Sequence, residues 1–452
     1  MTRLERGGVA EAGIGAGRLA AFIEALAACG QEVQTLMLVR HGKVVLEHEC
    51  APYRLTDRHA VYSISKSFTS MAIGLAIEDG LLALDDRVVS FFDERDLPSQ
   101  IGDNLAAMRV RDLLTMTTGH AEDTVERIHG DRMVQAFLAL DVEEKPGTLF
   151  VYNSGATYML SAILQRVTGE KLLDYLKPRL FDPIGASEAR WEETPEGINT
   201  GGWGLEVNTE SLAVFGQLLL NKGGDVLPAH WVEAATSGQV PNDNQDNVDW
   251  KQGYGFQFWR SRHNSYRADG AFGQYVLVLP EQDAVLVITS ASPDMQAVLN
   301  VVWQHLLPAF EGPDDGTYAP NVSFELTPPA TGKPAAGHGT TYSFEQNPFG
   351  LTKVRLDPDG SGTFTYDFGS GEAQDVVCRE GDWQADQWRL GWLGDQLVTS
   401  ATGDPFTASM RFTETPSLYT LTCRPDGDTM TVDVLRNVGF GPGDATLTGH
   451  AL

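Results

Sequence analysis

The chain has 452 residues, a formal net charge of −28, 42% hydrophobic residues and 21% charged residues. This length exceeds one ordinary domain, and the composition supports a large folded core. The negative charge argues against nucleic acid or an anionic membrane surface as a partner. No stretch approaches the roughly 18 apolar residues of a membrane-spanning helix, and the N-terminus does not have the pattern of a secretion signal. We therefore expect a cytoplasmic protein.

Residues 1–312 predict an α+β domain. A helix around residues 19–26 is followed by strands at 34–40 and 43–49, and then by helices that begin near residues 63, 110, 154, 170 and 210. Strand patterns return at 253–260, 273–280 and 283–290, before a helix over 292–310 with Ser292 as its N-cap. This order suggests an antiparallel sheet that is closed from both chain ends, with a helical lobe inserted.

The composition of the sequence changes near Gly312. Residues 313–340 are rich in Pro and Gly and indicate a linker. Beyond them, over 341–452, short strand patterns recur about every 8 to 12 residues with turn residues between them. This spacing predicts a C-terminal all-β barrel or sandwich.

The stretch HAVYSISKSFTSMAIGLAIEDG, residues 59–80, predicts a buried helix with a lysine near its start. Lysine is almost never fully buried without a partner. Ser63 and Ser70 lie three residues before and four residues after Lys66, so both share its face of the helix. Ser70 is inside the helix, whereas Ser63 stands at its entrance, where unpaired amide groups and the helix dipole stabilise an oxyanion.

Burial gives this lysine a chemical role. An ammonium group in apolar surroundings loses hydration, so its pKa falls, and a neutral amine beside a hydroxyl can act as a general base. Ser63 is therefore the candidate nucleophile and Lys66 its base. The alternative is a helix cap at Ser63 followed by a lysine that extends to solvent.

A second candidate group lies in PGTLFVYNSGATYMLS, residues 146–161. Tyr152 ends an extended segment just before a helix, so it can point into a cleft. There it can transfer a proton as an acid, or act as a base when deprotonated beside an ammonium. Asn153 and Ser154 are candidates to extend the hydrogen-bond network. The alternative for Tyr152 is a buried side chain whose hydroxyl is satisfied.

Together these motifs resemble the class C β-lactamase and penicillin-binding-protein-like serine hydrolases, which include esterases, D-aminopeptidases and 6-aminohexanoate-dimer hydrolase. Ser-x-x-Lys, DLLTMTTGH, PGTLFVYNSGATYMLS and GAFGQYVLVLPEQDAVLVITS occur here in that order. The resemblance covers residues 15–310 and implies a β-lactamase/transpeptidase-like fold. The trailing β domain is similar to the lipocalin-like barrels that some members carry.

The resemblance also assigns roles to residues. It makes Ser63 the acylated nucleophile, Lys66 its base partner and Tyr152 the acid/base residue of the second motif. The backbone N–H of Ser63 would form half of an oxyanion hole. The other half would come from the strand edge near Ala268 and Gly270, and two such donors matter about as much as the nucleophile itself.

Two motifs depart from the family pattern. The second motif usually reads Tyr-x-Asn, whereas Asn153 and Ser154 follow Tyr152 here, so the third position is a hydroxyl. No Lys-Thr-Gly or His-x-Gly triplet is visible on the last strand, where SYRADG supplies Arg267 as the nearest cation. Arg267 is a candidate to bind a substrate carboxylate, with a surface charge as the alternative. Loss of the triplet lysine argues against efficient penicillin hydrolysis.

The sequence thus predicts a serine hydrolase that cleaves an ester or amide bond of a small molecule or short peptide through an acyl-enzyme on Ser63. We expect no metal or organic cofactor, because the histidines are scattered and the four cysteines have no metal-ligand spacing. We also expect no nucleic-acid or membrane partner. The alternatives are a true β-lactamase or DD-peptidase and a non-catalytic ligand-binding relative; the oligomeric state is not predicted.

Overall fold

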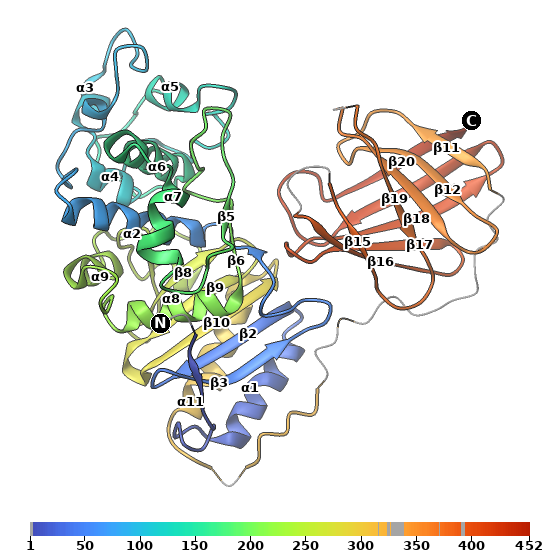
Figure 1. The fold of residues 1–452 in the computed structure, drawn as a ribbon, viewed down its shortest axis with the longest axis horizontal. Coiled ribbons are helices and arrows are strands. Elements are labelled where there is room, and N and C mark those ends of the chain that lie inside the picture. The colour runs from blue at the N-terminus through green and yellow to red at the C-terminus, as the bar shows by residue number, and fades with distance from the viewer. Residues whose placement is uncertain (1–2, 315, 323–325, 327–338, 370, 390–393) are drawn as a thin grey trace.

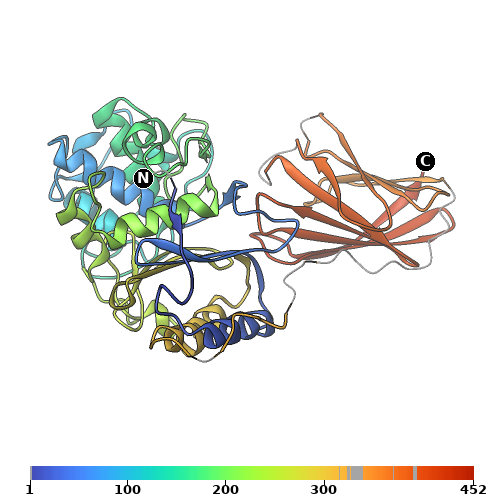
Figure 2. The ribbon, with the colours of Figure 1, turned by 60° about the horizontal axis from the view of Figure 1, so that its bottom comes forward.

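The computed structural model describes residues 3–314, 316–322, 326, 339–369, 371–389 and 394–452. An N-terminal body of sheet and helices lies beside a C-terminal body of strands (Figures 1 and 2). The predicted α+β class with a C-terminal all-β barrel is therefore confirmed. Much of the predicted linker, 313–340, lies outside the described residues.

Among the described residues, seven strands form the sheet of the N-terminal body. In spatial order they are β1 (Glu5–Arg6), β3 (Lys43–Glu49), β2 (Glu32–Arg40), β10 (Ala284–Ala291), β9 (Gln274–Leu279), β8 (Tyr266–Gly270) and β7 (Trp259–Arg260). All neighbours are antiparallel except β1 and β3. Strand β10 pairs with β2, with Val287 opposite Met37. Segments from both ends of the N-terminal body thus form the centre of the sheet, as predicted.

Alternation of side chains along these strands produces two apolar cores, one on each face of the sheet. One face is covered by α1 (Ala16–Ala28), α10 (Met295–Val301), a π-helical turn (Val302–Leu306) and α11 (Leu307–Ala309). Helix α8 (Thr209–Leu220) packs on the other face. The predicted N-cap Ser292 is wrong: the helix starts later, and Asp294 accepts the N–H of Ala297 at 3.1 Å. Ser292 instead donates its hydroxyl to Ser290.

The remaining helices of the N-terminal body form a lobe on the α8 side of the sheet (Figure 1). They are α3 (Asp103–Ala107), α4 (Val110–Leu114), α5 (Met133–Leu138), α6 (Ser154–Thr168), α7 (Leu172–Leu176), a π-helical turn (Lys177–Phe181) and α9 (Ala229–Thr236). Short 3-10 turns lie at Val88–Phe91, Val248–Trp250 and Pro280–Gln282. A small sheet of β4 (His59–Ala60), β6 (Leu205–Val207) and β5 (Arg190–Trp191) borders this lobe. None of the described helices is long and apolar enough to cross a membrane.

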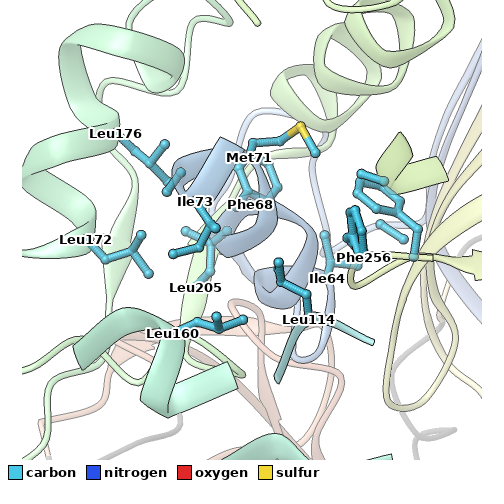
Figure 3. Close-up of a cluster of buried hydrophobic side chains, with 14 of the residues drawn as sticks. Ile64, Phe68, Met71, Ile73, Leu114, Leu160, Leu172, Leu176, Leu205 and Phe256 are labelled. Carbon is cyan, nitrogen blue, oxygen red and sulfur yellow. The ribbon is translucent and has the colours of Figure 1, made fainter. Parts of the chain in front are cut away.

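Helix α2 (Ile64–Glu78) runs between the lobe and the sheet (Figure 1). Every residue from its start to Gly74 is buried. Figure 3 shows apolar side chains closing around this helix from several elements, among them Leu160 of α6, Leu172 of α7 and Leu205 of β6. Any polar side chain on this stretch is therefore removed from water, which is the condition that a lysine there must meet.

The C-terminal body contains ten strands within the described residues. In order around the sheet they are β14 (Gln374–Cys378), β13 (Gly362–Tyr366), β12 (Leu351–Leu356), β11 (Thr341–Phe344), β20 (Asp444–Ala451), β19 (Thr429–Arg436), β18 (Leu418–Asp426), β17 (Phe406–Phe412), β16 (Gln396–Thr402) and β15 (Gln384–Gln387). All neighbours are antiparallel. Thr399 on β16 donates to the carbonyl of Val377 on β14 at 3.0 Å, so the sheet nearly closes into a barrel.

Specific polar contacts attach the barrel to the N-terminal body. The backbone N–H of Ala60, on β4, donates to the carbonyl of Glu414 at 2.7 Å. The Glu414 carboxylate accepts from Arg58 at 2.8 Å. Both Nη atoms of Arg411 donate to the Glu32 carboxylate, at 2.6 and 2.8 Å. The barrel is thus joined to the strand that leads directly into helix α2.

Candidate active site

Ser63 lies immediately before helix α2, and the backbone N–H groups of the first turn donate to carbonyls three residues earlier, with the Lys66 N–H donating to the Ser63 carbonyl at 3.0 Å. Its hydroxyl makes no capping hydrogen bond with those amides. Lys66 is one turn further along the helix, and its Nζ lies 2.9 Å from Ser63 Oγ. Lys66 is 1% exposed, so it does not extend to solvent. The alternative of a helix cap followed by a solvated lysine therefore does not hold.

Two further acceptors surround the Lys66 amine. Its Nζ lies 2.7 Å from the carbonyl oxygen of Gly202 and 3.1 Å from Ser154 Oγ. A neutral amine has two N–H donors and one lone pair. With the donors directed at Gly202 and Ser154, the lone pair faces the hydroxyl of Ser63. The arrangement therefore suits an amine that accepts a proton from that hydroxyl.

The electrostatic surroundings adjust the basicity of Lys66. Burial lowers its pKa from 10.5 to about 8, because the ammonium loses hydration in apolar surroundings. The carboxylates of Asp123 and Asp269 act in the opposite direction and favour the ammonium. At pH 8 about half of the amine is therefore neutral, which is the condition that a general base near physiological pH requires.

Tyr152 contacts both members of this pair. Lys66 Nζ lies 4.8 Å from the centre of the Tyr152 ring, and the Ser63 side chain is near enough to the Tyr152 hydroxyl to act on its pKa, in the direction that lowers it. The ring packs against Trp259, with ring centres 5.1 Å apart. Burial raises the pKa of Tyr152 well above its ordinary value, and the charge of Asp269 adds to this effect. Tyr152 therefore remains a neutral phenol, which favours the acid role over the base role.

Asn153 and Ser154 make different contacts. Asn153 is buried and caps α6, since its Oδ1 accepts the N–H of Ala156 at 3.2 Å. The same oxygen accepts the Thr124 hydroxyl at 2.8 Å. These bonds hold the start of the helix in place, so Asn153 is a positioning residue within the hydrogen-bond network. Ser154, the first residue of α6, is the one that reaches Lys66.

Arg267 is not the accessible cation that we expected. Its side chain is 0% exposed, and its Nε donates to Asp269 at 2.8 Å. Its Nη1 donates to Ser261 Oγ and to the carbonyl of Asp249, and its guanidinium carbon lies 4.3 Å from the centre of the Trp250 ring. Alternate residues of a strand share one face, so Arg267 and Asp269 pair within β8. This charge is already neutralised, which argues against a role in binding a substrate carboxylate.

The end of strand β8 lies close to the residues before Ser63. Ala268 is buried within this strand, and a Cβ on Gly270 would lie 2.2 Å from the carbonyl oxygen of Val61. Only a glycine allows this approach. Among the described residues, the backbone N–H groups of Ser63 and Ala271 have no hydrogen-bond partner. Two unpaired donors therefore lie at the start of helix α2 and directly after β8.

Three contributors to the site were not predicted as such. Asp123 and Gly202 are far from Lys66 in the sequence, and only the fold brings them to its amine. Asp269 is the third, and its alternation with Arg267 along a strand was the available signal for an ion pair. In the described part of the chain, no three His, Cys, Asp or Glu side chains are grouped as metal ligands would be.

Comparison with known proteins gives consistent matches. The family model described as Beta-lactamase matches residues 19–306. The 6-aminohexanoate-dimer hydrolase of Paenarthrobacter ureafaciens is 25% identical over 57% of this chain and 72% of its own length. Lovastatin esterase of Penicillium rubens is 24% identical over 41% of this chain and 52% of its own. The structure of an octameric penicillin-binding protein homologue from Pyrococcus abyssi superposes with a TM-score of 0.53 at 16% identity, covering 95% of this chain and 99% of that one.

Proposed function

Because this chain belongs to the β-lactamase family, we propose that it is a serine hydrolase that acts through an acyl-enzyme on Ser63. The substrate would be a small molecule or short peptide with an ester or amide bond. The observation that carries the proposal is the 2.9 Å contact between Ser63 Oγ and the amine of Lys66, a residue that is only 1% exposed. Relatives named as a dimer hydrolase, an esterase and a D-aminopeptidase support this range of substrates.

In the first half of the reaction, Ser63 Oγ attacks the substrate carbonyl carbon while its proton passes to the neutral amine of Lys66. The carbonyl oxygen becomes an oxyanion. The N–H groups of Ser63 and Ala271 are the proposed donors for it, because both are unpaired. The tetrahedral intermediate collapses when the bond to the leaving group breaks. Tyr152 then donates its proton to that group and recovers one from the Lys66 ammonium.

In the second half, water attacks the ester formed on Ser63. Lys66 takes the proton of the water, and the Ser63 oxygen leaves with a proton returned through the same groups. Every proton that leaves one group is taken up by another, so the cycle needs no further reactant. Binding, positioning and the proton transfers are all assigned to side chains and backbone groups of this chain.

Substrate choice is proposed from the charges near the site. The Lys-Thr-Gly lysine is absent, and the nearest candidate cation, Arg267, is buried and paired with Asp269. A β-lactam carboxylate would therefore find no free cation at this position. We propose that simple esters and short amides are hydrolysed in preference to penicillins. A chromogenic cephalosporin hydrolysed as fast as p-nitrophenyl butyrate would contradict this preference.

The test is the mass of the intact protein after exposure to a fluorophosphonate, combined with p-nitrophenyl butyrate hydrolysis. The wild type should gain one adduct, and Ser63→Ala should lose both the adduct and the turnover. Ser70→Ala is the matched control, because its buried hydroxyl on the same helix makes no hydrogen bond within the described part of the chain. It should retain labelling. Labelling that persists in Ser63→Ala, or its absence from the wild type at any pH, would refute the proposal, and the second result would favour a non-catalytic binding protein.

A further inference from the structure

The barrel contains an apolar pocket of its own. Leu351, Tyr366, Trp388, Met410, Leu421 and Val434 contribute to its wall, and all are buried. Trp388 directly follows β15, and the others lie on β12, β13, β17, β18 and β19, so the sheet forms the wall of the pocket. Concave apolar cavities with a few polar groups are typical of small-molecule binding sites.

Two buried N–H donors of this pocket have no partner among the described residues. Trp388 is 3% exposed, and its Nε1 makes no hydrogen bond. Arg436 is 7% exposed, and its Nε likewise makes none. Leaving a buried donor unpaired costs free energy, which a ligand with an oxygen acceptor would restore. The Tyr366 hydroxyl, also in the wall, donates only to the thioether of Met410.

The pocket borders the hydrolase site through one aromatic residue. Phe440 lines the pocket and is 70% exposed. Its ring centre lies 6.1 Å from that of Tyr62 and 5.2 Å from that of Phe272. Tyr62 precedes Ser63 in the sequence, and Phe272 follows Ala271. The same residue therefore touches both the pocket and the segments that carry the proposed nucleophile and oxyanion donors.

Two features fix the position of the pocket. Arg436 Nη2 donates to the carbonyls of Phe440 and Gly441, at 2.7 and 3.0 Å, and so holds the loop that carries the shared ring. The N–H of Ala60 donates to the carbonyl of Glu414, so the barrel is anchored three residues before Ser63. A group bound in the pocket would therefore keep a fixed position relative to Ser63.

We propose that this barrel pocket binds the apolar acyl chain of the substrate, so that the enzyme prefers esters or amides of medium- or long-chain acids that carry an oxygen acceptor. This proposal rests on the proposed serine hydrolase function. The acyl chain would pass Phe440 into the barrel while its carbonyl stays at Ser63. The unpaired N–H groups of Trp388 and Arg436 would bind an oxygen on the chain.

A series of p-nitrophenyl esters from acetate to decanoate tests the proposal on the full chain. Each methylene that leaves water for the pocket should raise kcat/KM about fourfold until the pocket is full. Leu421→Trp, which fills the pocket, and Phe440→Ala, which removes the shared ring, should each lower the decanoate-to-acetate ratio of kcat/KM by about tenfold or more. Leu435→Ala is the matched control, because this exposed apolar side chain lies outside the pocket on the same strand as Val434. It should leave the ratio unchanged.

Calorimetric titration of the Ser63→Ala protein with sodium decanoate measures binding without turnover. Decanoate should bind, and 10-hydroxydecanoate, whose chain oxygen can accept from Trp388, should bind more tightly; Trp388→Phe, which keeps an aromatic ring but removes the donor, should weaken the binding of 10-hydroxydecanoate about fivefold. A flat chain-length series, or equal ratios in wild type, Leu421→Trp and Phe440→Ala, would overturn the pocket proposal and leave the hydrolase function intact. If the wild type hydrolyses no ester, the hydrolase function fails instead, and the assignment of the pocket to its substrate fails with it.

Discussion

Replacing Asp123 with Asn provides a direct test of Lys66 as the base. The Asp123 carboxylate stabilises the ammonium form of Lys66 and so opposes the larger effect of burial, and the resulting pKa is about 8. Its Oδ1 accepts the N–H of Ser154 at 2.8 Å and that of Val125 at 3.0 Å. The amide oxygen of Asn can accept both bonds. The substitution therefore removes a charge with little change in geometry.

The expected pH dependence follows from the neutral amine being the active form. In the wild type, kcat/KM for an ester should rise with pH through an apparent pKa of about 8. The neutral fraction increases from about one tenth at pH 7 to about nine tenths at pH 9, so kcat/KM should rise about tenfold over this interval. In Asp123→Asn the rise should occur at lower pH, because the ammonium has lost a stabilising charge.

The assay is kcat/KM for p-nitrophenyl butyrate, corrected for spontaneous hydrolysis, from about pH 6 to pH 10. Glu122→Gln is the matched control, since it removes an equal charge from the neighbouring residue, which is exposed and does not act on Lys66. It should leave the profile in place. A flat wild-type profile, or an Asp123→Asn profile displaced to higher pH, would refute the assignment. Tyr152 cannot account for a rise near pH 8, because burial holds its pKa far above that value.

Three further substitutions have expected outcomes. Tyr152→Phe should lower kcat about 10²- to 10⁴-fold in steady-state assays, because it removes the proposed acid without removing the ring. Gly270→Ala should abolish most ester hydrolysis in the same assay, because its Cβ would lie 2.2 Å from the Val61 carbonyl oxygen and force β8 away from the nucleophile. Arg411→Met should lower the free energy of unfolding by about 3 kcal/mol in denaturant titrations, because it leaves the partly buried Glu32 carboxylate unpaired between the two bodies.

Each of these outcomes has a contrary result. If Tyr152→Phe turned over at a rate close to that of the wild type, a group other than Tyr152 would donate the proton to the leaving group. Wild-type activity in Gly270→Ala would show that the approach of β8 to Val61 does not position the site. Denaturation of Arg411→Met with an unchanged midpoint and slope would mean that the ion pair contributes nothing to stability, as many exposed pairs do.

The central pair could be predicted because its geometry is local. Residues three apart on a helix share a face, and an apolar run after the lysine indicates burial, so Ser63 and Lys66 could be placed together without a fold. The extended segment before Asn153 likewise placed Tyr152 at the edge of a helix. The fold class followed from the order of elements, since strands at both ends of the first 312 residues bracket the helices.

The remaining features depend on contacts between distant segments. Nothing near Gly202 indicates that its carbonyl accepts from Lys66, because any backbone carbonyl has the same chemistry. Strand β20 is poorly marked in the sequence, since its Thr- and Gly-rich segment lacks a strong apolar alternation. The buried state of Arg267 depends on Trp250 and Asp249, which reach it from another segment. The helix predicted to begin near residue 110 is short and ends at Leu114.

The balance of charges around Lys66 explains how one site can both release and take up a proton. Desolvation alone would make the amine weakly basic, so it would be neutral at physiological pH but poor at accepting a proton. The carboxylates of Asp123 and Asp269 stabilise the ammonium that forms when Ser63 attacks, at the moment when positive charge develops. Arg267 neutralises part of the charge of Asp269, which reduces the stabilisation that Asp269 gives to the Lys66 ammonium. A pKa of about 8 is the result of these opposing effects, and it lies where an amine can exchange protons in both halves of the reaction.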